Sequence, residues 1–350
     1  MGPHLYHLIA FMAASLVVMW TTPMVRTVGL KSGRVDLPGG RKVHDRPMVR
    51  LGGVSIFCGT VLALVLVWWL GGFGILPLQE ERGVWGVALG GLAFFAIGLT
   101  DDLLGLSPFS RLVMQVAVAT VCWHVGVSID FLTVPGIGLV QLGLLSLPVT
   151  VIWLVGMVNA INWIDGLDGL AAGVSGISAS VMLFVCIFMG QPAAGLIAAA
   201  LAGAALGFLR YNFNPAQIFM GDGGSYFMGF TLAGVGAIGM VKTTAITSVL
   251  LPYIILAVPL LDMSAVILRR LMDGQSPFRA DKRHLHHRLL NAGLSHRLAV
   301  LFIYALTLWV GSIGLAFSGI PSGGAFALGA TGLLSYTSWQ VWRQARTSSS

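Results

Sequence analysis

Charged residues are scarce in this chain, and their scarcity limits the class of protein. Only 9% of the 350 residues are Asp, Glu, Lys or Arg, whereas a soluble domain carries about 25%. Hydrophobic residues make up 56% of the sequence, and the excess over a soluble domain must face lipid. The composition therefore excludes an ordinary soluble domain and indicates a membrane protein.

Other features that are missing narrow the class further. The three cysteines have no metal-ligand spacing and are expected to be buried small hydrophobes. A His-Glu-x-x-His pair is absent, which argues against an intramembrane metalloprotease. Strands of alternating polarity are absent, which argues against a β-barrel. No basic stretch precedes the first hydrophobic segment, so we expect it to be a permanent span and not a cleaved signal peptide.

Hydrophobic segments long enough to cross a membrane recur along the whole sequence. We predict an all-α polytopic membrane protein with about eleven transmembrane helices, ten being the alternative count, in a single integral-membrane domain of residues 1–350. The stretch 128–145 is expected to contain a hairpin or a re-entrant piece. The predicted spans cover residues 5–24, 51–70, 84–99, 111–127, 146–161, 170–189, 192–209, 226–241, 244–264, 298–318 and 321–342.

The basic residues lie almost entirely on one predicted side of the membrane. All but two of the 20 Lys and Arg residues follow odd-numbered spans, the exceptions being Arg82 and Lys242. The positive-inside rule then places the amino terminus outside and the carboxyl terminus in the cytoplasm. This bias accounts for the net charge of +7 without a nucleic-acid partner. The predicted cytoplasmic loops cover about residues 25–50, 100–110, 162–169, 210–225 and 265–297.

Most of the acidic and amide side chains fall in these loops. A carboxylate near the bilayer centre costs about 2.5–3.5 kcal/mol, so acids at span ends usually face a cavity, a metal or a polar substrate. Oxygen ligands of this kind suit a hard cation such as Mg²⁺, and one of two paired carboxylates can accept a proton. The motifs are Asp101-Asp102, Asn159-Ala-Ile-Asn162, Asp165-Gly-Leu-Asp168-Gly169 and Phe219-Met-Gly-Asp222.

Two loops are basic instead. Arg50 precedes Gly52-Gly53 at a predicted helix start, where backbone N–H groups and an arginine favour a phosphate. The alternative for this loop is a plain positive-inside anchor. The cluster His284-Leu-His286-His287 has the donors for zinc, but the basic residues beside it repel a cation. Phosphate binding fits that cluster better, and plain positive-inside charge is the further alternative. Acids for a metal and basic loops for a pyrophosphate together indicate phosphoryl transfer at a membrane surface.

Taken together, the motifs resemble the polyprenyl-phosphate N-acetylhexosamine-1-phosphate transferases, of the glycosyltransferase family 4 type. The resemblance covers nearly the whole chain, with the motifs in the family's order. The Arg50-Leu-Gly-Gly53 and His284-Leu-His286-His287 forms are closer to the WecA/TagO-like branch than to the MraY branch. Val49 stands where the family pattern has proline, a departure that removes no chemical group.

This resemblance implies a reaction and a setting. N-acetylglucosamine-1-phosphate would pass from UDP-N-acetylglucosamine to undecaprenyl phosphate, with release of UMP, as the first lipid-linked intermediate of a cell-envelope glycan. The expected setting is a bacterial inner membrane, with a cytoplasmic cleft, Mg²⁺ or Mn²⁺, and membrane lipids as partners. Whether the chain forms a homodimer is left open. The alternatives are another UDP-N-acetylamino sugar and, from a different class, a membrane transporter, whose polar residues should lie near mid-span and on both sides.

The resemblance also implies roles for single residues. Asp101 and Asp102 are expected to deprotonate or position the lipid phosphate, in a direct attack or in a covalent two-step route. Asp222 is expected to be the main metal ligand, with Asn162 as a second. Asp262 is expected to brace the site. The nucleotide-binding set is Asn212, Phe219, Asp165 and Asp168, and the phosphate- and sugar-binding set is Arg50, Arg111, His284, His286 and His287.

Overall fold

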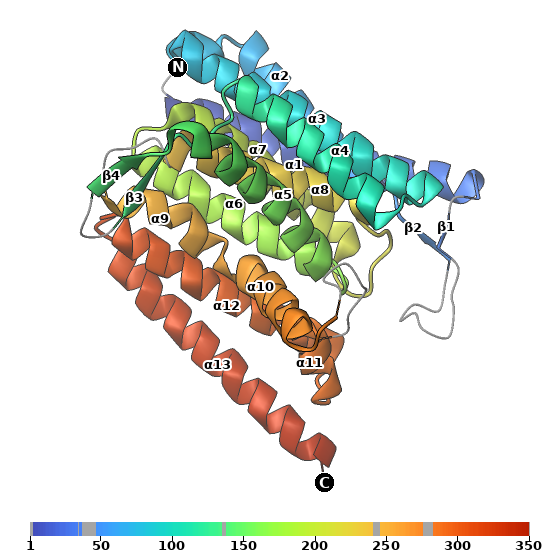
Figure 1. The fold of residues 1–350 in the computed structure, drawn as a ribbon. Helices are drawn as coiled ribbons and strands as arrows, with labels where there is room; N and C mark the ends of the chain where they lie inside the picture. Colours follow the sequence, from blue (N-terminus) through green and yellow to red (C-terminus); the bar gives the residue numbers. More distant parts are fainter. Residues whose placement is uncertain are drawn as a thin grey trace.

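The computed structural model describes residues 3–33, 35–36, 47–134, 138–240, 246–275 and 283–349. Within these ranges the chain forms thirteen α-helices and two short antiparallel hairpins (Figure 1). The helices are α1 Pro3–Lys31, α2 Gly52–Trp69, α3 Leu78–Leu104, α4 Pro108–His124, α5 Ser146–Ile164, α6 Leu170–Phe188, α7 Pro192–Asn212, α8 Gly221–Val235, α9 Ile246–Ile255, α10 Ala257–Met272, α11 Leu285–Asn291, α12 His296–Phe317 and α13 Gly323–Ser349. The strands are β1 Val35–Asp36, β2 Met48–Val49, β3 Phe131–Val134 and β4 Gly138–Gln141.

Seven helices in the described ranges are long and apolar enough to cross a membrane. They are α1, α2, α3, α5, α6, α7 and α12. A polytopic all-α membrane protein is therefore confirmed, while the count of eleven spans stays a prediction. The expected hairpin within 128–145 is confirmed as β3–β4, with Phe131 opposite Gln141.

The structure differs from the predicted spans at one helix and at several ends. The predicted ninth span, 244–264, is two helices, because α9 ends at Ile255 and α10 begins at Ala257. Pro259 accounts for the break, since its ring would clash with the carbonyl four residues earlier, that of Ile255. Several helices also continue into predicted loops, and α3 reaches Leu104. Much of the polar chemistry thus lies on helix ends and not on free loops.

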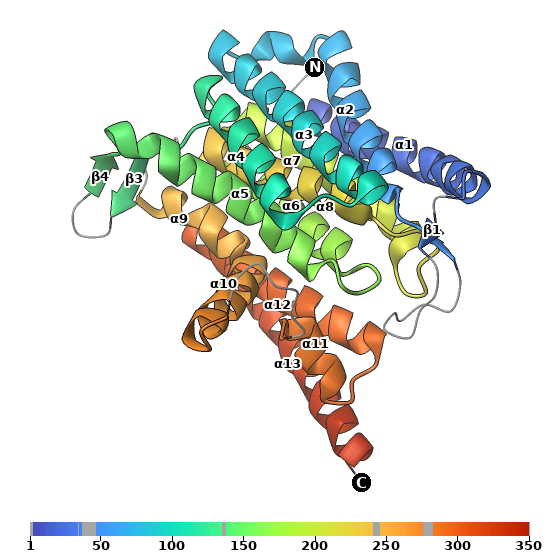
Figure 2. The same cartoon turned by 45° about the vertical axis from the view of Figure 1, so that its right-hand side comes forward.

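The bundle is organised around its smallest side chains. Helix α7 is rich in Ala and Gly and is largely buried, whereas α1 is mostly exposed. Small residues let membrane helices approach closely. Figures 1 and 2 show α2, α3 and α4 along one face of the bundle and α12 with α13 along the opposite face. The two hairpins lie at opposite ends of the helices (Figures 1 and 2).

Three helix ends meet almost backbone to backbone at the β1–β2 end of the bundle. The amides of Gly52 and Gly53, at the start of α2, donate to the carbonyls of Phe219 and Met220 at 2.9 and 2.8 Å. A Cβ on Gly98, near the end of α3, would overlap the backbone of Asp222 at the start of α8. These glycines therefore allow the chain segments that carry the acidic motifs to come together.

We predict that Gly98→Ala destabilises the protein. The added methyl group meets backbone atoms that cannot rotate away, so α3 and α8 must separate, and overpacking of this kind costs about 1–3 kcal/mol. The expected result is a thermal unfolding midpoint lowered by several degrees. Gly156→Ala in α5 is the matched control, because a Cβ there meets nothing within 4 Å and alanine favours a helix. An equal effect of the two substitutions would contradict the close approach of α3 to α8.

Candidate active site

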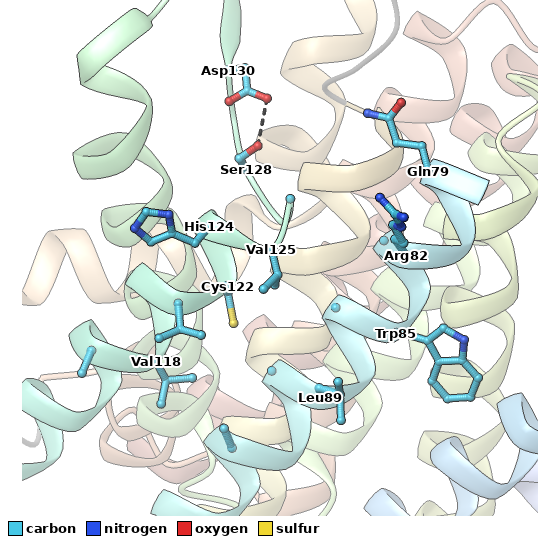
Figure 3. Close-up of a pocket in the computed structure, with 17 residues that line it drawn as sticks. Gln79, Arg82, Trp85, Leu89, Val118, Cys122, His124, Val125, Ser128 and Asp130 are labelled. Atoms are coloured by element: carbon cyan, nitrogen blue, oxygen red, sulfur yellow. Dashed lines mark hydrogen bonds between the residues drawn. The ribbon is translucent and has the colours of Figure 1, made fainter. Parts of the chain in front are cut away.

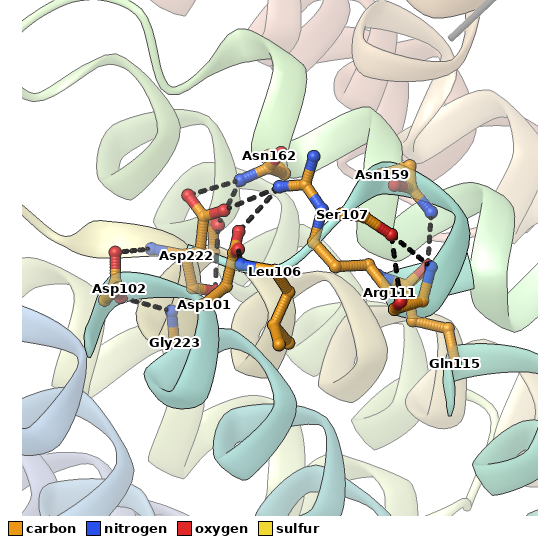
Figure 4. A network of polar contacts seen from close by, with 12 residues as sticks. Asp101, Asp102, Leu106, Ser107, Arg111, Gln115, Asn159, Asn162, Asp222 and Gly223 are labelled. Atoms are coloured by element: carbon orange, nitrogen blue, oxygen red, sulfur yellow. Dashed lines mark hydrogen bonds and ion pairs between the residues drawn. The ribbon is translucent and has the colours of Figure 1, made fainter. Parts of the chain in front are cut away.

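The acidic motifs converge where four helices end or begin. Asp101 and Asp102 lie in the last turn of α3, and Asp222 lies in the first turn of α8. Arg111 comes from the first turn of α4, and Asn162 from the last turn of α5. Figure 4 shows Asp101, Asp222, Arg111 and Asn162 turned towards one another, with Asp102 beside them and turned towards the start of α8. Residues far apart in the sequence therefore form a single polar group, and we call these five side chains the acid cluster.

Two of the three carboxylates face the same cation. The Nη1 atom of Arg111 donates to Oδ2 of Asp101 at 2.6 Å and to Oδ2 of Asp222 at 3.3 Å. Asn162 Nδ2 donates to Oδ1 of Asp222 at 3.1 Å. The side chains of Asp101 and Asp222 are 9% and 16% exposed, so both reach the edge of the open space. This arrangement gathers negative oxygen atoms where a bound cation or a phosphate-bearing ligand can meet them.

Asp102 faces the other way and holds the start of α8. Its two oxygen atoms accept hydrogen bonds from the backbone N–H groups of Asp222 and Gly223, at 3.0 and 2.9 Å. Only 3% of its side chain is exposed. A carboxylate at a helix N-terminus is favoured both by the free N–H groups and by the helix dipole. The contacts of Asp102 are thus those of a residue that positions Asp222.

Deeper in the bundle, a polar contact joins α4 directly to α5. Asn159 Nδ2 donates to Oε1 of Gln115 at 2.8 Å, and Gln115 is 1% exposed. These residues lie about one helical turn below Arg111 and Asn162, so the contact fixes the spacing of the two helices that carry them. Sequence reasoning missed Gln115. Its signal was that it is the one amide side chain of the predicted span 111–127.

A cavity of about 770 Å³ adjoins the acid cluster. Of the predicted nucleotide-binding residues, Phe219, Asp165 and Asp168 line it with side chains of intermediate exposure. Arg50 also lines it, and its Nη2 atom lies 3.7 Å from Oδ1 of Asp222. Arg50 therefore connects the cavity to the acid cluster. Gln217 and His296 also line the cavity, and sequence reasoning did not single them out.

Asn212 borders the same cavity but is engaged in the fold. It is 3% exposed, its Oδ1 accepts from the amide of Gly169 at 3.1 Å, and its Nδ2 donates to the carbonyl of Ile218 at 2.9 Å. The side chain thus joins the loop after α5 to the loop after α7. With both ends of the amide engaged, Asn212 shapes the cavity wall through these two loops.

The loop between α7 and α8 is held by contacts from distant parts of the chain. Asp168 Oδ2 accepts hydrogen bonds from Asn214 Nδ2 and from the amide of Ala216, at 3.1 and 3.0 Å. Arg26 of α1 donates to the carbonyl of Gln217 at 3.0 Å. Arg297 of α12 donates to the carbonyl of Asn214 at 3.2 Å. This side of the cavity is therefore held by the first helix and by a helix near the end of the chain.

The histidine cluster is ordered by Asp262. The Oδ2 atom of Asp262 lies 2.8 Å from Nδ1 of His284, and Oδ1 accepts from the amide of Leu285 at 2.7 Å. His286 is 2% exposed, and its ring lies against Gly166, where a Cβ would overlap it. Burial, together with the neighbouring His287 and His284, lowers the pKa of His286 to about 3. His286 is therefore neutral at pH 7 and offers hydrogen bonding without positive charge.

Parts of both basic loops lie outside the described residues. These are residues 34 and 37–46 of the first loop and residues 276–282 of the second. The described residues of those loops divide between two places. Arg50 reaches the acid cluster, whereas His286 packs against the loop that follows α5.

Comparison with known proteins identifies the family. A model of glycosyl transferase family 4 matches residues 84–240, the stretch that carries Asp101, Asn162 and Asp222. The chain is 37% identical over 301 residues to a probable undecaprenyl-phosphate N-acetylglucosaminyl 1-phosphate transferase of Bacillus subtilis, covering 85% of this chain and 81% of that protein. The chain belongs to glycosyl transferase family 4. The resemblance to the polyprenyl-phosphate N-acetylhexosamine-1-phosphate transferases is thereby confirmed.

Two further relatives differ in the lipid that their names give. A decaprenyl-phosphate N-acetylglucosaminephosphotransferase of Mycobacterium tuberculosis is 37% identical over 328 residues, with 86% of this chain and 79% of that protein covered. An undecaprenyl-phosphate alpha-N-acetylglucosaminyl 1-phosphate transferase of Haemophilus influenzae is 32% identical over 314 residues, with 88% and 84% covered. These three relatives thus share the named sugar and differ in the named prenyl lipid.

Asp165 is one of the acids at this family 4 site whose pKa is raised. Although Asp165 keeps some exposure to the cavity, the protein atoms around its carboxyl group displace water and raise its pKa to about 7, with help from the charges of Asp102 and Asp168 and against that of Arg50. The unfolded value is about 3.9. Between pH 4 and 7 the folded protein therefore holds a proton that the unfolded chain has lost. The stability that Asp165 contributes is complete at low pH and is lost as pH rises towards and through 7.

We predict that Asp165→Asn removes this pH dependence, because asparagine resembles the protonated carboxyl group and does not titrate. Between pH 5 and pH 8, the unfolding midpoint of the unchanged protein should fall relative to that of the variant, by several degrees at pH 8. Thermal unfolding of the two proteins side by side at pH 5, 6, 7 and 8 measures the difference. Parallel curves across that range would show that the pKa of Asp165 is not raised.

Proposed function

We propose that this protein transfers N-acetylglucosamine-1-phosphate from UDP-N-acetylglucosamine to undecaprenyl phosphate and releases UMP. The observation that carries the proposal is the convergence of Asp101, Asp222 and Arg111 at helix ends beside a cavity of about 770 Å³. Phosphoryl transfer needs this combination of positioned acids and cations with room for a nucleotide. The names of the relatives in Bacillus subtilis and Haemophilus influenzae support the choice of sugar and lipid.

The position of each residue decides its proposed role in the reaction. In this proposal the cavity holds the nucleoside, with Phe219 stacking on the base, and Arg50 and Arg111 contact the phosphates. Asp101, whose carboxylate is 9% exposed and is held by the amide of Leu106 and by Arg111, is the acid placed to meet the lipid phosphate. An oxygen of that phosphate attacks the β-phosphorus, and the bond from this phosphorus to the oxygen bridging the two phosphates breaks as UMP leaves. We favour this direct attack over a covalent route through Asp102, because both oxygen atoms of Asp102 bind backbone amides.

We also propose Mg²⁺ as the cofactor, with Mn²⁺ as a substitute, held by Asp222 and by the amide oxygen of Asn162. The carboxylates fit, because the oxygen atoms of Asp222 and Asp101 already gather around one cationic group, that of Arg111. Asn162 donates its amide nitrogen to Asp222 in this structure and would turn its amide to offer the oxygen to the ion. No group of three His, Cys, Asp or Glu side chains in the described ranges could hold a metal by itself. That agrees with Mg²⁺, which takes one or two carboxylates and completes its shell with water and substrate phosphates. The bound ion would neutralise charge on the pyrophosphate.

The setting follows from the placement of charge. The protein is a multi-pass membrane protein. We propose that it lies in a bacterial plasma membrane with the acid cluster and the carboxyl terminus on the cytoplasmic side. The excess of Lys and Arg at that end of the bundle supports this orientation.

The purified protein should release UMP when mixed with undecaprenyl phosphate, Mg²⁺ and UDP-N-acetylglucosamine. We expect little release with UDP-glucose, because a site built to hydrogen-bond an acetamido group rejects a sugar that lacks it. The measurement is UMP release across a panel of UDP-sugars, with chelation as the control for the metal. Release with another UDP-N-acetylamino sugar alone would change the substrate and keep the mechanism. No release with any donor, from protein shown to be folded, would overturn the proposal.

Asp222→Asn should abolish metal-dependent transfer and leave the fold intact, because the amide is nearly isosteric with the carboxylate but carries no charge for the ion. Loss of at least about a hundredfold in turnover is expected, the scale of one lost electrostatic contact in an active site. Binding of Mn²⁺, followed by electron paramagnetic resonance, should weaken in the same variant. Glu81→Gln, near the other end of α3, is the matched control. Unchanged Mn²⁺ binding in Asp222→Asn would remove Asp222 from the metal site.

A further inference from the structure

A second cavity, of about 930 Å³, lies between α3 and α4 at the end away from the acid cluster. Gln79 and Arg82, at the start of α3, line it together with His124 at the end of α4. The stretch of α3 from Arg82 to Asp101 rises about 29 Å at about 1.5 Å per residue, close to the roughly 30 Å of a hydrocarbon core. The cavity mouth therefore lies at the opposite membrane face from the acids, and we call this cavity the α3–α4 groove.

The deeper part of the α3–α4 groove is apolar and open towards the membrane. Leu89 and Ala93 of α3 line it, as do Ala117 and Val121 of α4. Leu89 and Val121 are 64% and 61% exposed, which places lipid-accessible side chains along the groove. From Gln79 to Ala93 the helix rises about 21 Å, which matches one head group and one leaflet of roughly 15 Å. This depth suits the acyl chain of a phospholipid better than a long prenyl chain.

The mouth carries two opposite charges that are not paired with each other. Figure 3 shows Arg82 and Gln79 on one side, His124 on the other and Asp130 near the top of the view. Arg82 is exposed, and within the described residues it makes no hydrogen bond or ion pair. Asp130 accepts from Ser128 Oγ at 2.8 Å and from Ser146 Oγ at 2.9 Å. Each of its oxygen atoms still has a lone pair for another donor.

We propose that the α3–α4 groove binds a phospholipid whose head group carries both a phosphate and a primary ammonium, the class of phosphatidylethanolamine. Arg82 binds the phosphate, Asp130 accepts a hydrogen bond from the ammonium, and one acyl chain lies between α3 and α4. A purely anionic head group would meet the negative charge of Asp130. A trimethylated head group has no N–H to donate to it.

Such a lipid would act on the site from a distance. α3 and α4 carry Asp101 and Arg111 at their far ends, and a ligand that binds only the folded pair stabilises their packing. The lipid site nevertheless stands apart from the proposed transfer reaction, because none of its lining residues belongs to the acid cluster or to the nucleotide cavity.

The test is native mass spectrometry of the full-length protein in detergent, mixed with equal amounts of phosphatidylethanolamine, phosphatidylcholine and phosphatidylglycerol of the same acyl chains. We expect phosphatidylethanolamine to be retained at least about tenfold more than phosphatidylcholine, the scale of a hydrogen bond to a charged group. Equal retention of the three lipids, or a preference for phosphatidylglycerol, would overturn the proposal.

Variants locate the binding. Arg82→Gln should abolish the preference, and Arg82→Lys should keep part of it. Ala117→Phe should block the acyl chain, since Ala117 is exposed and lines the groove. The matched controls are Arg346→Gln on α13 and Ala96→Phe, at an exposed alanine of α3 that does not line the groove. Unchanged unfolding midpoints show that each variant folds. Retention unaffected by Arg82→Gln, or lost equally in Ala96→Phe, would place the lipid elsewhere.

Discussion

One buried carboxylate determines the geometry of the acid cluster. Asp102 accepts hydrogen bonds from the first amides of α8, and this contact is possible because Gly98 lets α3 approach the backbone of Asp222. Asp101 precedes Asp102 in the chain, and Asp222 supplies one of the two amides. The buried Asp102 therefore fixes the positions of Asp101 and Asp222, the two acids that face the open space. A carboxylate used in this way stabilises a helix start and places the neighbouring side chains in one step.

Hydropathy predicted where the membrane-spanning segments of the fold lie. Apolar runs show where the chain meets lipid, so every predicted span except the ninth corresponds to one helix. In the eighth span, that helix is followed by a short π-helical turn, Gly236–Met240. Helical hydrogen bonding continues beyond the lipid, however, so hydropathy does not predict the residue at which a helix ends. The extension of α3 to Leu104 is an example. Pro259 was visible in the sequence, but membrane helices tolerate proline, so the division into α9 and α10 could not be read from it.

The chemistry of the site was predictable to the extent that it depends on residue type. Carboxylates and amides at span ends indicated a shared site, and the structure brings Asp101, Asp222 and Asn162 together. Contacts that depend on packing could not be predicted. The burial that keeps His286 neutral, the engagement of Asn212 by two loops and the pairing of Gln115 with Asn159 all require the arrangement of helices in space.

The contacts that hold the loop between α7 and α8 have a consequence for the order of folding during synthesis. Arg26 holds this loop from α1, whereas Arg297 holds it from α12. Because synthesis proceeds from the amino terminus, the acid cluster has all its members once α8 has emerged, while Arg297 arrives only with α12. A nascent chain thus assembles its charged centre first and fastens the wall of the adjoining cavity late. Premature termination before α12 would leave a chain with its acids in place and that wall held by Arg26 and Asp168 without Arg297.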